Sequence, residues 1–509
     1  MKMLSRMSVL LLPVLTISLC ALVVGFHLAS AIGGYPHYRD QHLGAAINYA
    51  RDGVDFLRPI IPGFDANHVG TPQEPPLWQA LAALGIRVLH GNWVAGNIVS
   101  LLLFASGLWP LWKIAADSLG PRGAWWTLIA FLTQPLIFLV AGQASVDGLS
   151  LVFAIWFYYA TLMMIRGGSW SWLPLVVVAG ILSSTTKLPL FMAAGAGAGF
   201  LLLAEYRNRP ARWIQLVIAG LVCAGVFFWW NRLTTNILVT AEYPQVKLWL
   251  KDNPAMWRWY FGDWAFRLNP ANWIKGGWSA LNCLFGSFAL VGFFVLGLLR
   301  GSLRPVLCWL AGTLLTLMIF SHLVLVHRHY YILFSPVIAL LVGSALLVVE
   351  EKLRATAFPI RLLTAPLLAG VLLLGTVQGL IGMEVVLNYD PFYKRMANLI
   401  REHVGENEKI LIQGGGWGQM LMLSDREGLA IFADATLTQP GTVDDLRKRG
   451  FTKLVMLSES PLLWALKKTN PGAGALERES YRDHWTDVID PWPIEYQDAD
   501  LLIKRLPEH

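Results

Sequence analysis

The sequence predicts a polytopic α-helical membrane protein with a small soluble α/β domain at its C-terminus. Of the 509 residues, 55% are hydrophobic and only 14% are charged, and the mean hydropathy is +0.51. A soluble domain carries about 25% charged residues. A soluble globule of this length could not bury so much apolar surface. The same composition excludes a disordered chain, a coiled coil and a collagen-like repeat.

The spacing of the charged residues marks the membrane helices. A spanning helix needs about 20 apolar residues, and eleven stretches without Asp, Glu, Lys or Arg approach or exceed that length. These stretches lie between residues 6–39, 87–113, 122–147, 147–166, 166–187, 187–205, 212–232, 275–300, 304–328, 328–350 and 361–384. We therefore expect about eleven membrane-spanning helices within a transmembrane domain of residues 1–383.

Clusters of Lys and Arg predict the orientation of these helices. With eleven spans, the basic clusters in the connections all fall on one side of the membrane, as they do at Lys2 and Arg6 before the first helix. The positive-inside rule assigns that side to the cytoplasm. The first apolar stretch is too long for the apolar region of a signal peptide, so we expect it to remain as an anchor. The N-terminus is then cytoplasmic.

The composition changes after residue 383 and predicts a separate domain at 384–509. Short apolar runs at 409–412, 429–432 and 453–457 alternate with helical patterns. This alternation is typical of a small α/β domain. An odd number of spans places it on the outer side of the membrane, as an extracytoplasmic domain.

Two outer loops are long, at about residues 33–92 and 231–277. The second is dense in Trp, a residue that favours the membrane–water interface. It is consistent with amphipathic helices lying on the bilayer and with one wall of a groove for a lipid substrate. In the first loop, Pro75 and Pro76 favour an extended entry into a juxtamembrane helix.

Ionisable residues that a membrane protein normally avoids gather at the outer ends of the helices. Asp147 and Lys187 lie between apolar runs, and such residues point to function by default. Snorkelling is the alternative for Lys187, and a short solvated turn is the alternative for Asp147. The outer loops add further polar side chains: Asp40, Arg58, His68, Glu74, Arg328, His329 and Tyr331.

These residue types match the needs of glycosyl transfer from a lipid phosphate. An acid near the membrane surface can deprotonate an acceptor hydroxyl or hold a metal ion. Arg and Lys can bind the phosphate of the leaving group. No phosphate-binding loop, zinc-protease motif or Ser-centred hydrolase motif is present. The net charge of +7 is spread over short clusters, so we expect no nucleic-acid partner.

An ordered set of motifs resembles a known family. The set comprises Tyr38-Arg-Asp40, Pro75-Pro-Leu-Trp78, Ser145-Val-Asp-Gly-Leu149, Gly180-Ile-Leu-Ser-Ser-Thr-Thr-Lys187 and Arg328-His-Tyr-Tyr-Ile332. On these motifs, residues 30–350 resemble the GT-C glycosyltransferases, within the family 39 or protein mannosyltransferase-like group. That group includes the lipid A aminoarabinose transferases. The resemblance implies an inverting glycosyltransferase of a bacterial inner membrane that uses a polyprenyl-phosphate sugar.

The family's functional residues carry over to matching positions. The loop acid implicated in catalysis corresponds to Asp40, the second acid to Asp147, and the lysine to Lys187. The sequence departs from the family before the Pro-Pro motif, where Gln73-Glu74 replaces an acidic-basic pair. Arg58 or Arg328 would then supply the donor-phosphate contact. Asp40 is followed by Gln41 instead of the family's Glu.

The sequence therefore predicts catalytic roles for Asp40 and Asp147, and donor-phosphate binding by Arg328, Lys187 and Arg58. A second set of residues, Glu74, His68, His329 and Tyr331, is expected to contact a divalent metal ion or the acceptor. The expected partners are membrane lipid, the polyprenyl-phosphate sugar and a glycan, lipid or protein acceptor. Two alternatives stay open, a transporter or flippase of lipid-linked glycans and a sensor or scaffold that recognises through its C-terminal domain.

Overall fold

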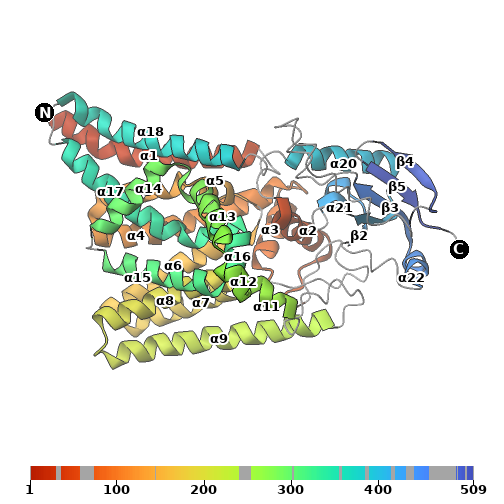
Figure 1. Ribbon diagram of the computed structural model, residues 1–509, viewed down its shortest axis with the longest axis horizontal. Helices are drawn as coiled ribbons and strands as arrows, with labels where there is room; N and C mark the ends of the chain where they lie inside the picture. Colours follow the sequence, from red (N-terminus) through yellow and green to blue (C-terminus); the bar gives the residue numbers. More distant parts are fainter. Residues whose placement is uncertain are drawn as a thin grey trace. The chain divides into compact units, whose positions relative to one another are not determined.

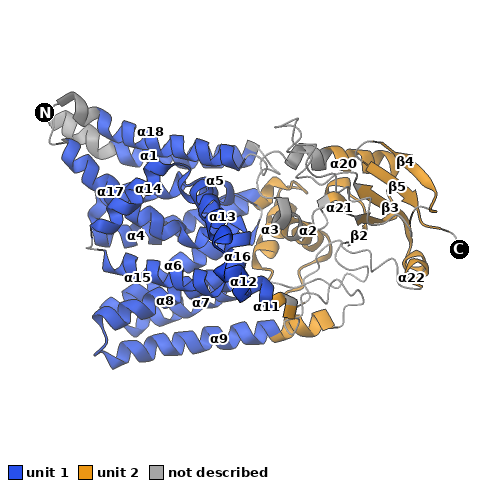
Figure 2. Cartoon of the chain, in the orientation of Figure 1, with its two compact units in different colours: residues 1–31, 97–231, 257–383 blue, residues 32–96, 232–256, 384–509 orange. Residues whose placement is uncertain are grey.

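The computed structural model describes residues 2–29, 36–57, 74–143, 145–239, 254–300, 303–354, 358–383, 389–413, 419–431, 441–457, 489, 491–498 and 501–507. The chain divides into two compact units, each built from separate segments of the sequence (Figure 2). Unit 1 comprises residues 1–31, 97–231 and 257–383, and unit 2 comprises residues 32–96, 232–256 and 384–509.

Apolar helices of varied length lie wholly or mainly in unit 1 (Figure 1). In chain order they are α1 (Lys2–Ala29), α4 (Val94–Leu132), α5 (Pro135–Val140), α6 (Val146–Gly167), α7 (Leu173–Thr186), α8 (Leu188–Glu205), α9 (Pro210–Val239), α11 (Pro254–Phe261), α12 (Trp264–Leu268), α13 (Pro270–Ala280), α14 (Phe288–Leu299), α15 (Arg304–Ile319), α16 (Ser321–Val326), α17 (Ser335–Arg354) and α18 (Phe358–Gly382). The helical turns η1 (Trp170–Trp172), η2 (Leu281–Phe285) and η3 (Arg328–Phe334) connect neighbouring helices.

The fold class predicted from the sequence is confirmed. Within the described residues, seven helices are long and apolar enough to cross a membrane, and the bent pair at 270–299 raises the number to eight. Each of the eleven charge-free stretches contains a helix. Two of them, 87–113 and 122–147, overlap α4, whose helical run is broken at Gly120 with a φ of 75°. The chain is a multi-pass membrane protein, and the number of spans stays a prediction.

Small residues allow the helices of unit 1 to approach closely. A Cβ atom on Gly312 of α15 would lie 2.4 Å from the Ala193 carbonyl of α8. A Cβ atom on Gly197 would in turn lie 2.7 Å from the Cα atom of Trp309. Close backbone approach through small residues is typical of helix pairs in membranes. Over an 18-residue apolar segment long enough to cross a membrane, 83% of α6 is buried inside the protein, whereas only 22% of α9 is buried. Helix α6 is therefore a central helix.

The helices of the second outer loop carry exposed aromatic side chains. Trp257 of α11 is 58% exposed and Trp264 of α12 is 74% exposed. Arg267 anchors this region, because its guanidinium donates hydrogen bonds to the carbonyls of Phe261 and Ile319. The structure thus has short helices with exposed Trp side chains here, and their position at a bilayer surface stays a prediction.

The predicted C-terminal α/β region contains a mixed sheet within unit 2. Its strands are β1 (Lys409–Gln413), β2 (Gly428–Ile431), β3 (Phe451–Leu457), β4 (Ile494–Gln497) and β5 (Leu501–Arg505), in the order β2-β1-β3-β5-β4. Strand β1 runs parallel to β2 and β3, and β5 runs antiparallel to β3 and β4. The helices are α20 (Tyr389–His403), α21 (Gln419–Ser424) and α22 (Thr442–Lys448).

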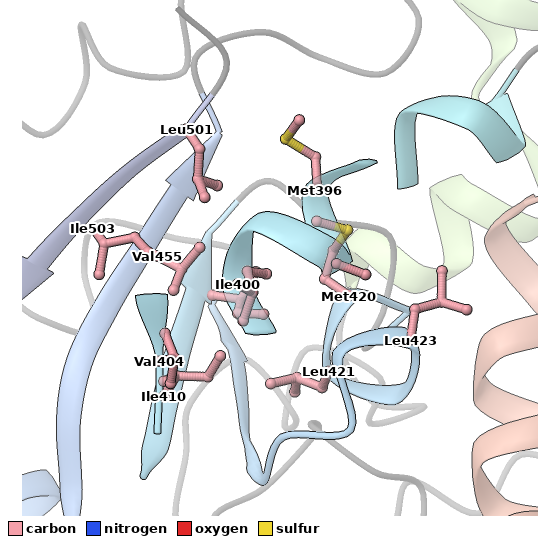
Figure 3. Packing of buried hydrophobic residues seen from close by; sticks show 12 residues of the cluster. Met396, Ile400, Val404, Ile410, Met420, Leu421, Leu423, Val455, Leu501 and Ile503 are labelled. Atoms are coloured by element: carbon pink, nitrogen blue, oxygen red, sulfur yellow. The ribbon is translucent and has the colours of Figure 1, made fainter. Parts of the chain in front are cut away.

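One apolar cluster joins α20 and α21 to the sheet (Figure 3). Met396 and Ile400 recur at helical spacing on α20, and both are fully buried. The sheet contributes Ile410 of β1, Val455 of β3 and Ile503 of β5 to the same cluster as these two helix residues. In each strand, the next residue points to the opposite face of the sheet. The two helices therefore bury a shared apolar stripe against one face of the sheet.

The first outer loop contributes a helical pair to unit 2, α2 (Pro36–Asp52) and α3 (Leu77–Val88). Helix α3 confirms that a helix follows the two prolines, and its place beside the membrane stays a prediction. The amide Nε2 of Gln79 lies 2.7 Å from Nδ1 of the buried His42. Arg87 donates to the carbonyls of Tyr49 and Ala50, which are among the last in α2, and thereby connects α3 to the end of α2.

Candidate active site

The centre of the candidate site is formed where two helices of unit 1 begin. Ser145 caps α6, and its hydroxyl accepts a hydrogen bond of 3.3 Å from the backbone amide of Asp147. Asp147 therefore lies in the first helical turn, where the helix dipole favours a negative charge. Lys187 has an extended conformation between α7 and α8. Pro189 fits the first turn of α8 but would interrupt a continuous helix, which explains the break.

Asp147 and Lys187 form a buried ion pair. The Nζ atom of Lys187 lies 3.4 Å from Oδ1 of Asp147, and their side chains are 6% and 5% exposed. Two charges removed from water are costly unless they compensate each other. Because both side chains are buried, the structure shows neither a snorkelling Lys187 nor a solvated turn at Asp147. Nζ of Lys187 also lies 5.1 Å from the centre of the Tyr330 ring, within cation–π range.

The turn η3 carries basic and aromatic side chains, and its Tyr330 lies beside Lys187. Arg328 is half-buried and His329 is 2% exposed. The His329 ring lies 4.5 Å from the Tyr330 ring and 5.5 Å from the His327 ring, measured between centroids. The hydroxyl of Tyr331 donates a 2.9 Å hydrogen bond to the Gly276 carbonyl of α13. Tyr331 thus ties η3 to the second outer loop.

The second outer loop is fixed to the same region through His322 and Trp259. The Nδ1–H of His322 on α16 donates a 2.8 Å hydrogen bond to the carbonyl of Trp259 on α11. The Trp259 ring also lies 4.9 Å from the His327 ring at an interplanar angle of 64°. The aromatic side chains of this loop therefore pack beside the residue that immediately precedes η3.

The remaining candidate residues belong to the first outer loop. Asp40 is on α2, but its side chain lies outside the described residues, and so do Arg58 and His68. Glu74 is half-buried immediately before the turn into α3. All four belong to unit 2. Their expected convergence with Asp147 stays a prediction.

The described residues around Asp147 do not fit a divalent metal ion. Within the part of the chain that the structure describes, no group of three His, Cys, Asp or Glu side chains is placed to hold a metal. Asp147 has a cation, Lys187, beside its carboxylate, whereas calcium and magnesium sites gather several oxygen ligands. We therefore derive no step that passes through a metal ion.

Sequence reasoning missed several residues that shape the site. Tyr330 covers Lys187, and Asn97 and Ser100 on α4 donate to the connection that leads into α6. Tyr330 belongs to the basic-aromatic motif, but the motif by itself predicts no role for it. Asn97 and Ser100 are separated by one helical turn in an apolar stretch, and that polar spacing was the available signal.

Comparisons with known proteins agree with this architecture. Residues 73–230 match the family model described as dolichyl-phosphate-mannose-protein mannosyltransferase. No curated protein sequence matches the chain. The structure of ArnT from Cupriavidus metallidurans bound to undecaprenyl phosphate is similar, with a TM-score of 0.60 and 14% identity, over 97% of this chain and 98% of that chain. Its apo structure gives a TM-score of 0.59 and 14% identity, over 97% of each chain.

The fold is thus shared along almost the whole length of ArnT. The matched family segment contains the Pro-Pro entry to α3 and both members of the Asp147–Lys187 pair. Residues 73–230 are therefore similar to a family of membrane glycosyltransferases, and the chain as a whole shares the fold of ArnT.

Proposed function

We propose that this protein transfers a sugar from a polyprenyl-phosphate donor to a lipid, glycan or protein acceptor at the outer face of a bacterial inner membrane, with inversion at the anomeric carbon. The observation that carries the proposal is the buried Asp147–Lys187 pair beside η3. A membrane protein retains such charges where they serve function. The undecaprenyl phosphate in the similar ArnT structure supports a polyprenyl-phosphate donor.

The chemistry requires a base for the acceptor and cations for the leaving group. Asp40 removes the proton of the acceptor hydroxyl, whose oxygen forms a bond to the anomeric carbon from the face opposite the phosphate. The bond between the anomeric carbon and the phosphate oxygen breaks, and its electron pair leaves with the phosphate. Lys187 and Arg328, with Arg58 from the first loop, stabilise the developing charge on that phosphate.

Asp147 has a supporting role in this scheme. It holds the Lys187 ammonium in place before the donor arrives, because the two groups are buried together. A donor phosphate offers Lys187 a second anionic partner. Holding the cation in advance means that less reorganisation is needed when the leaving group develops charge.

The proposed function is tested with purified protein in liposomes that contain a polyprenyl-phosphate sugar and a membrane-lipid acceptor extract. We expect Asp40→Asn and Asp147→Asn to abolish most transfer while the helical content stays unchanged. Asp117→Asn is the matched control, because Asp117 forms a more exposed pair with Arg166 at 3.3 Å in the same unit. Unchanged transfer by folded Asp40→Asn contradicts the proposal.

The same liposomes distinguish the enzyme from a flippase. A flippase moves the lipid-linked sugar between leaflets and leaves the sugar–phosphate bond intact. Release of free polyprenyl phosphate together with a glycosylated acceptor supports the transferase. Movement of intact donor without cleavage contradicts it.

The proposed orientation places the N-terminus in the cytoplasm and the sheet domain outside. It follows from the basic clusters of the connections. Single cysteines introduced at exposed positions such as Glu406 of the sheet domain and Arg207 between α8 and α9 would report their side. We expect an impermeant thiol reagent to label intact cells at position 406 and only permeabilised cells at position 207. The reverse pattern contradicts this orientation.

A further inference from the structure

The connection from α5 to α6 leads directly into Asp147, and side chains from other helices hold it. Helix α5 ends at Val140, and α6 begins at Val146. The last carbonyls of a helix, and those of the turn that follows, have no partner within the helix. Buried in a membrane protein, such carbonyls are satisfied by donors from outside the helix, either backbone amides or side chains.

Two polar side chains of α4 meet this need. Nδ2 of Asn97 donates a 2.9 Å hydrogen bond to the carbonyl of Gly142. Oγ of Ser100 donates a 2.6 Å hydrogen bond to the carbonyl of Gln143, which also accepts one of 2.7 Å from the backbone amide of Ser145, the residue that caps α6. Asn97 is 2% exposed and Ser100 is 7% exposed, so water does not compete strongly for these bonds.

A histidine from α1 holds the same connection from another helix. Nε2 of His27 donates a 2.9 Å hydrogen bond to the carbonyl of Phe138 in α5. The ring also packs against Gly142, where an added Cβ atom would lie 2.4 Å from Cγ of His27. His27 is fully buried. The backbone before α6 is therefore fixed by side chains of both α1 and α4.

We propose that Asn97 and Ser100 are positioning residues for Asp147, an inference that rests on the proposed function of that carboxylate. Their hydrogen bonds fix the backbone only a few residues before the first turn of α6. They thereby hold the Asp147 carboxylate at the distance from Lys187 that the ion pair requires. A displacement of the order of 1 Å at a catalytic group can cost about 100-fold in rate.

The test compares Ser100→Ala with Ser106→Ala. Ser106 lies on the same helix, but its hydroxyl bonds to the local carbonyl of Leu103 and is exposed. We expect Ser100→Ala to lower kcat by about 10-fold with a small change in the donor KM and an unchanged melting temperature. Ser106→Ala should keep the wild-type kcat. Asn97→Leu removes the second donor and should act in the same direction.

Restoring the hydroxyl separates positioning from a general packing effect. Ser100→Thr keeps a donor at the same place, and we expect it to recover most of the kcat lost in Ser100→Ala. A wild-type kcat in Ser100→Ala overturns the inference. It is also overturned if Ser100→Thr is as slow as Ser100→Ala while both variants melt at the wild-type temperature.

Asp147→Asn in the same assay keeps the two proposals distinguishable. If Asp147→Asn transfers sugar at the wild-type rate, the proposed role of Asp147 fails, and the inference about Ser100 fails with it. If Asp147→Asn is inactive while Ser100→Ala has the wild-type kcat, only the positioning inference fails.

Discussion

The Lys187 ammonium lies 3.4 Å from the Asp147 carboxylate, and each residue stands at the beginning of a helix, α8 and α6 respectively. The pair is neutral as a whole, so its burial costs less than burying either charge by itself. In the proposed mechanism, an arriving donor phosphate competes with Asp147 for the same ammonium group. This relationship connects the fold of unit 1 to the chemistry that we propose for it.

Neutralising one member of the pair should destabilise the protein more than neutralising both. Asp147→Asn leaves Lys187 buried without its partner, and removing one partner of a buried pair costs about 3–5 kcal/mol. We expect Asp147→Asn/Lys187→Met to recover part of that loss and to remain inactive. Thermal unfolding in detergent and the liposome transfer assay measure the two effects. An additive loss of stability in the double variant would contradict the pairing.

The exposed pair Asp117–Arg166 provides the control for that comparison. Its side chains are 31% and 32% exposed, and water screens such pairs. We expect Asp117→Asn to cost less than about 1 kcal/mol and to leave transfer unchanged.

The pair Arg122–Glu350 should contribute to stability without taking part in transfer. Nε of Arg122 donates a 2.6 Å hydrogen bond to Glu350, and Nε1 of Trp126 donates a second of 2.9 Å. The Glu350 side chain is 1% exposed. We expect Arg122→Met to lower the free energy of unfolding by about 3 kcal/mol, because the Glu350 carboxylate then lacks its cation. Transfer per folded molecule should stay at the wild-type value, and a selective loss of donor binding would be inconsistent with this prediction.

Gly142 should not tolerate a side chain. Its Cβ atom would lie 2.4 Å from Cγ and 2.7 Å from Cβ of His27. We expect Gly142→Ala to cost about 1–3 kcal/mol through overpacking and to lower kcat by shifting the backbone before Asp147. Gly220→Ala on α9 is the control, since nothing lies within 4 Å of its added Cβ atom. Equal melting temperatures and rates for the two variants would refute the close contact.

Acid should weaken the sheet domain through Glu408. Burial by itself raises the pKa of the Glu408 carboxyl, but hydrogen bonds from Lys453 and from the Gly405 amide outweigh it and bring the pKa below the ordinary 4.5. A pKa that is lower in the folded state contributes stability above the unfolded-state pKa. This contribution is lost as the pH falls through the folded-state pKa.

Hydrogen exchange of strand β3 in the full-length protein, followed from pH 7 to pH 3, measures this effect. The Nζ atom of Lys453 lies 2.8 Å from Glu408, and the Glu408 side chain is 31% exposed. We expect Glu408→Gln to cost no more than about 1 kcal/mol at pH 7 and to flatten the acid-dependent loss of protection. The exposed Glu406 provides the control substitution Glu406→Gln. An identical pH profile for Glu408→Gln and wild type would contradict the prediction.

Much of this fold could be predicted from the sequence, because the signals that define it are local. Charge-free stretches become helices since a buried backbone in a membrane must satisfy its own hydrogen bonds. Pro189 predicts a break because it lacks an amide proton. Asp147 and Lys187 could be selected as candidates by the cost of placing a charge between apolar residues.

Only the tertiary structure decided which of these residues meet. The distance between Asp147 and Lys187 depends on how α6 and α8 pack, and no local pattern encodes that packing. Tyr330 covers Lys187 only because η3 is brought beside the break between α7 and α8. Asn97 and Ser100 donate hydrogen bonds to carbonyls more than forty residues later in the chain, and the role that we propose for them depends on those bonds. By itself the sequence determined that buried charges exist. Long-range packing decided how each charge is compensated, because compensation requires atoms within a few ångströms of one another.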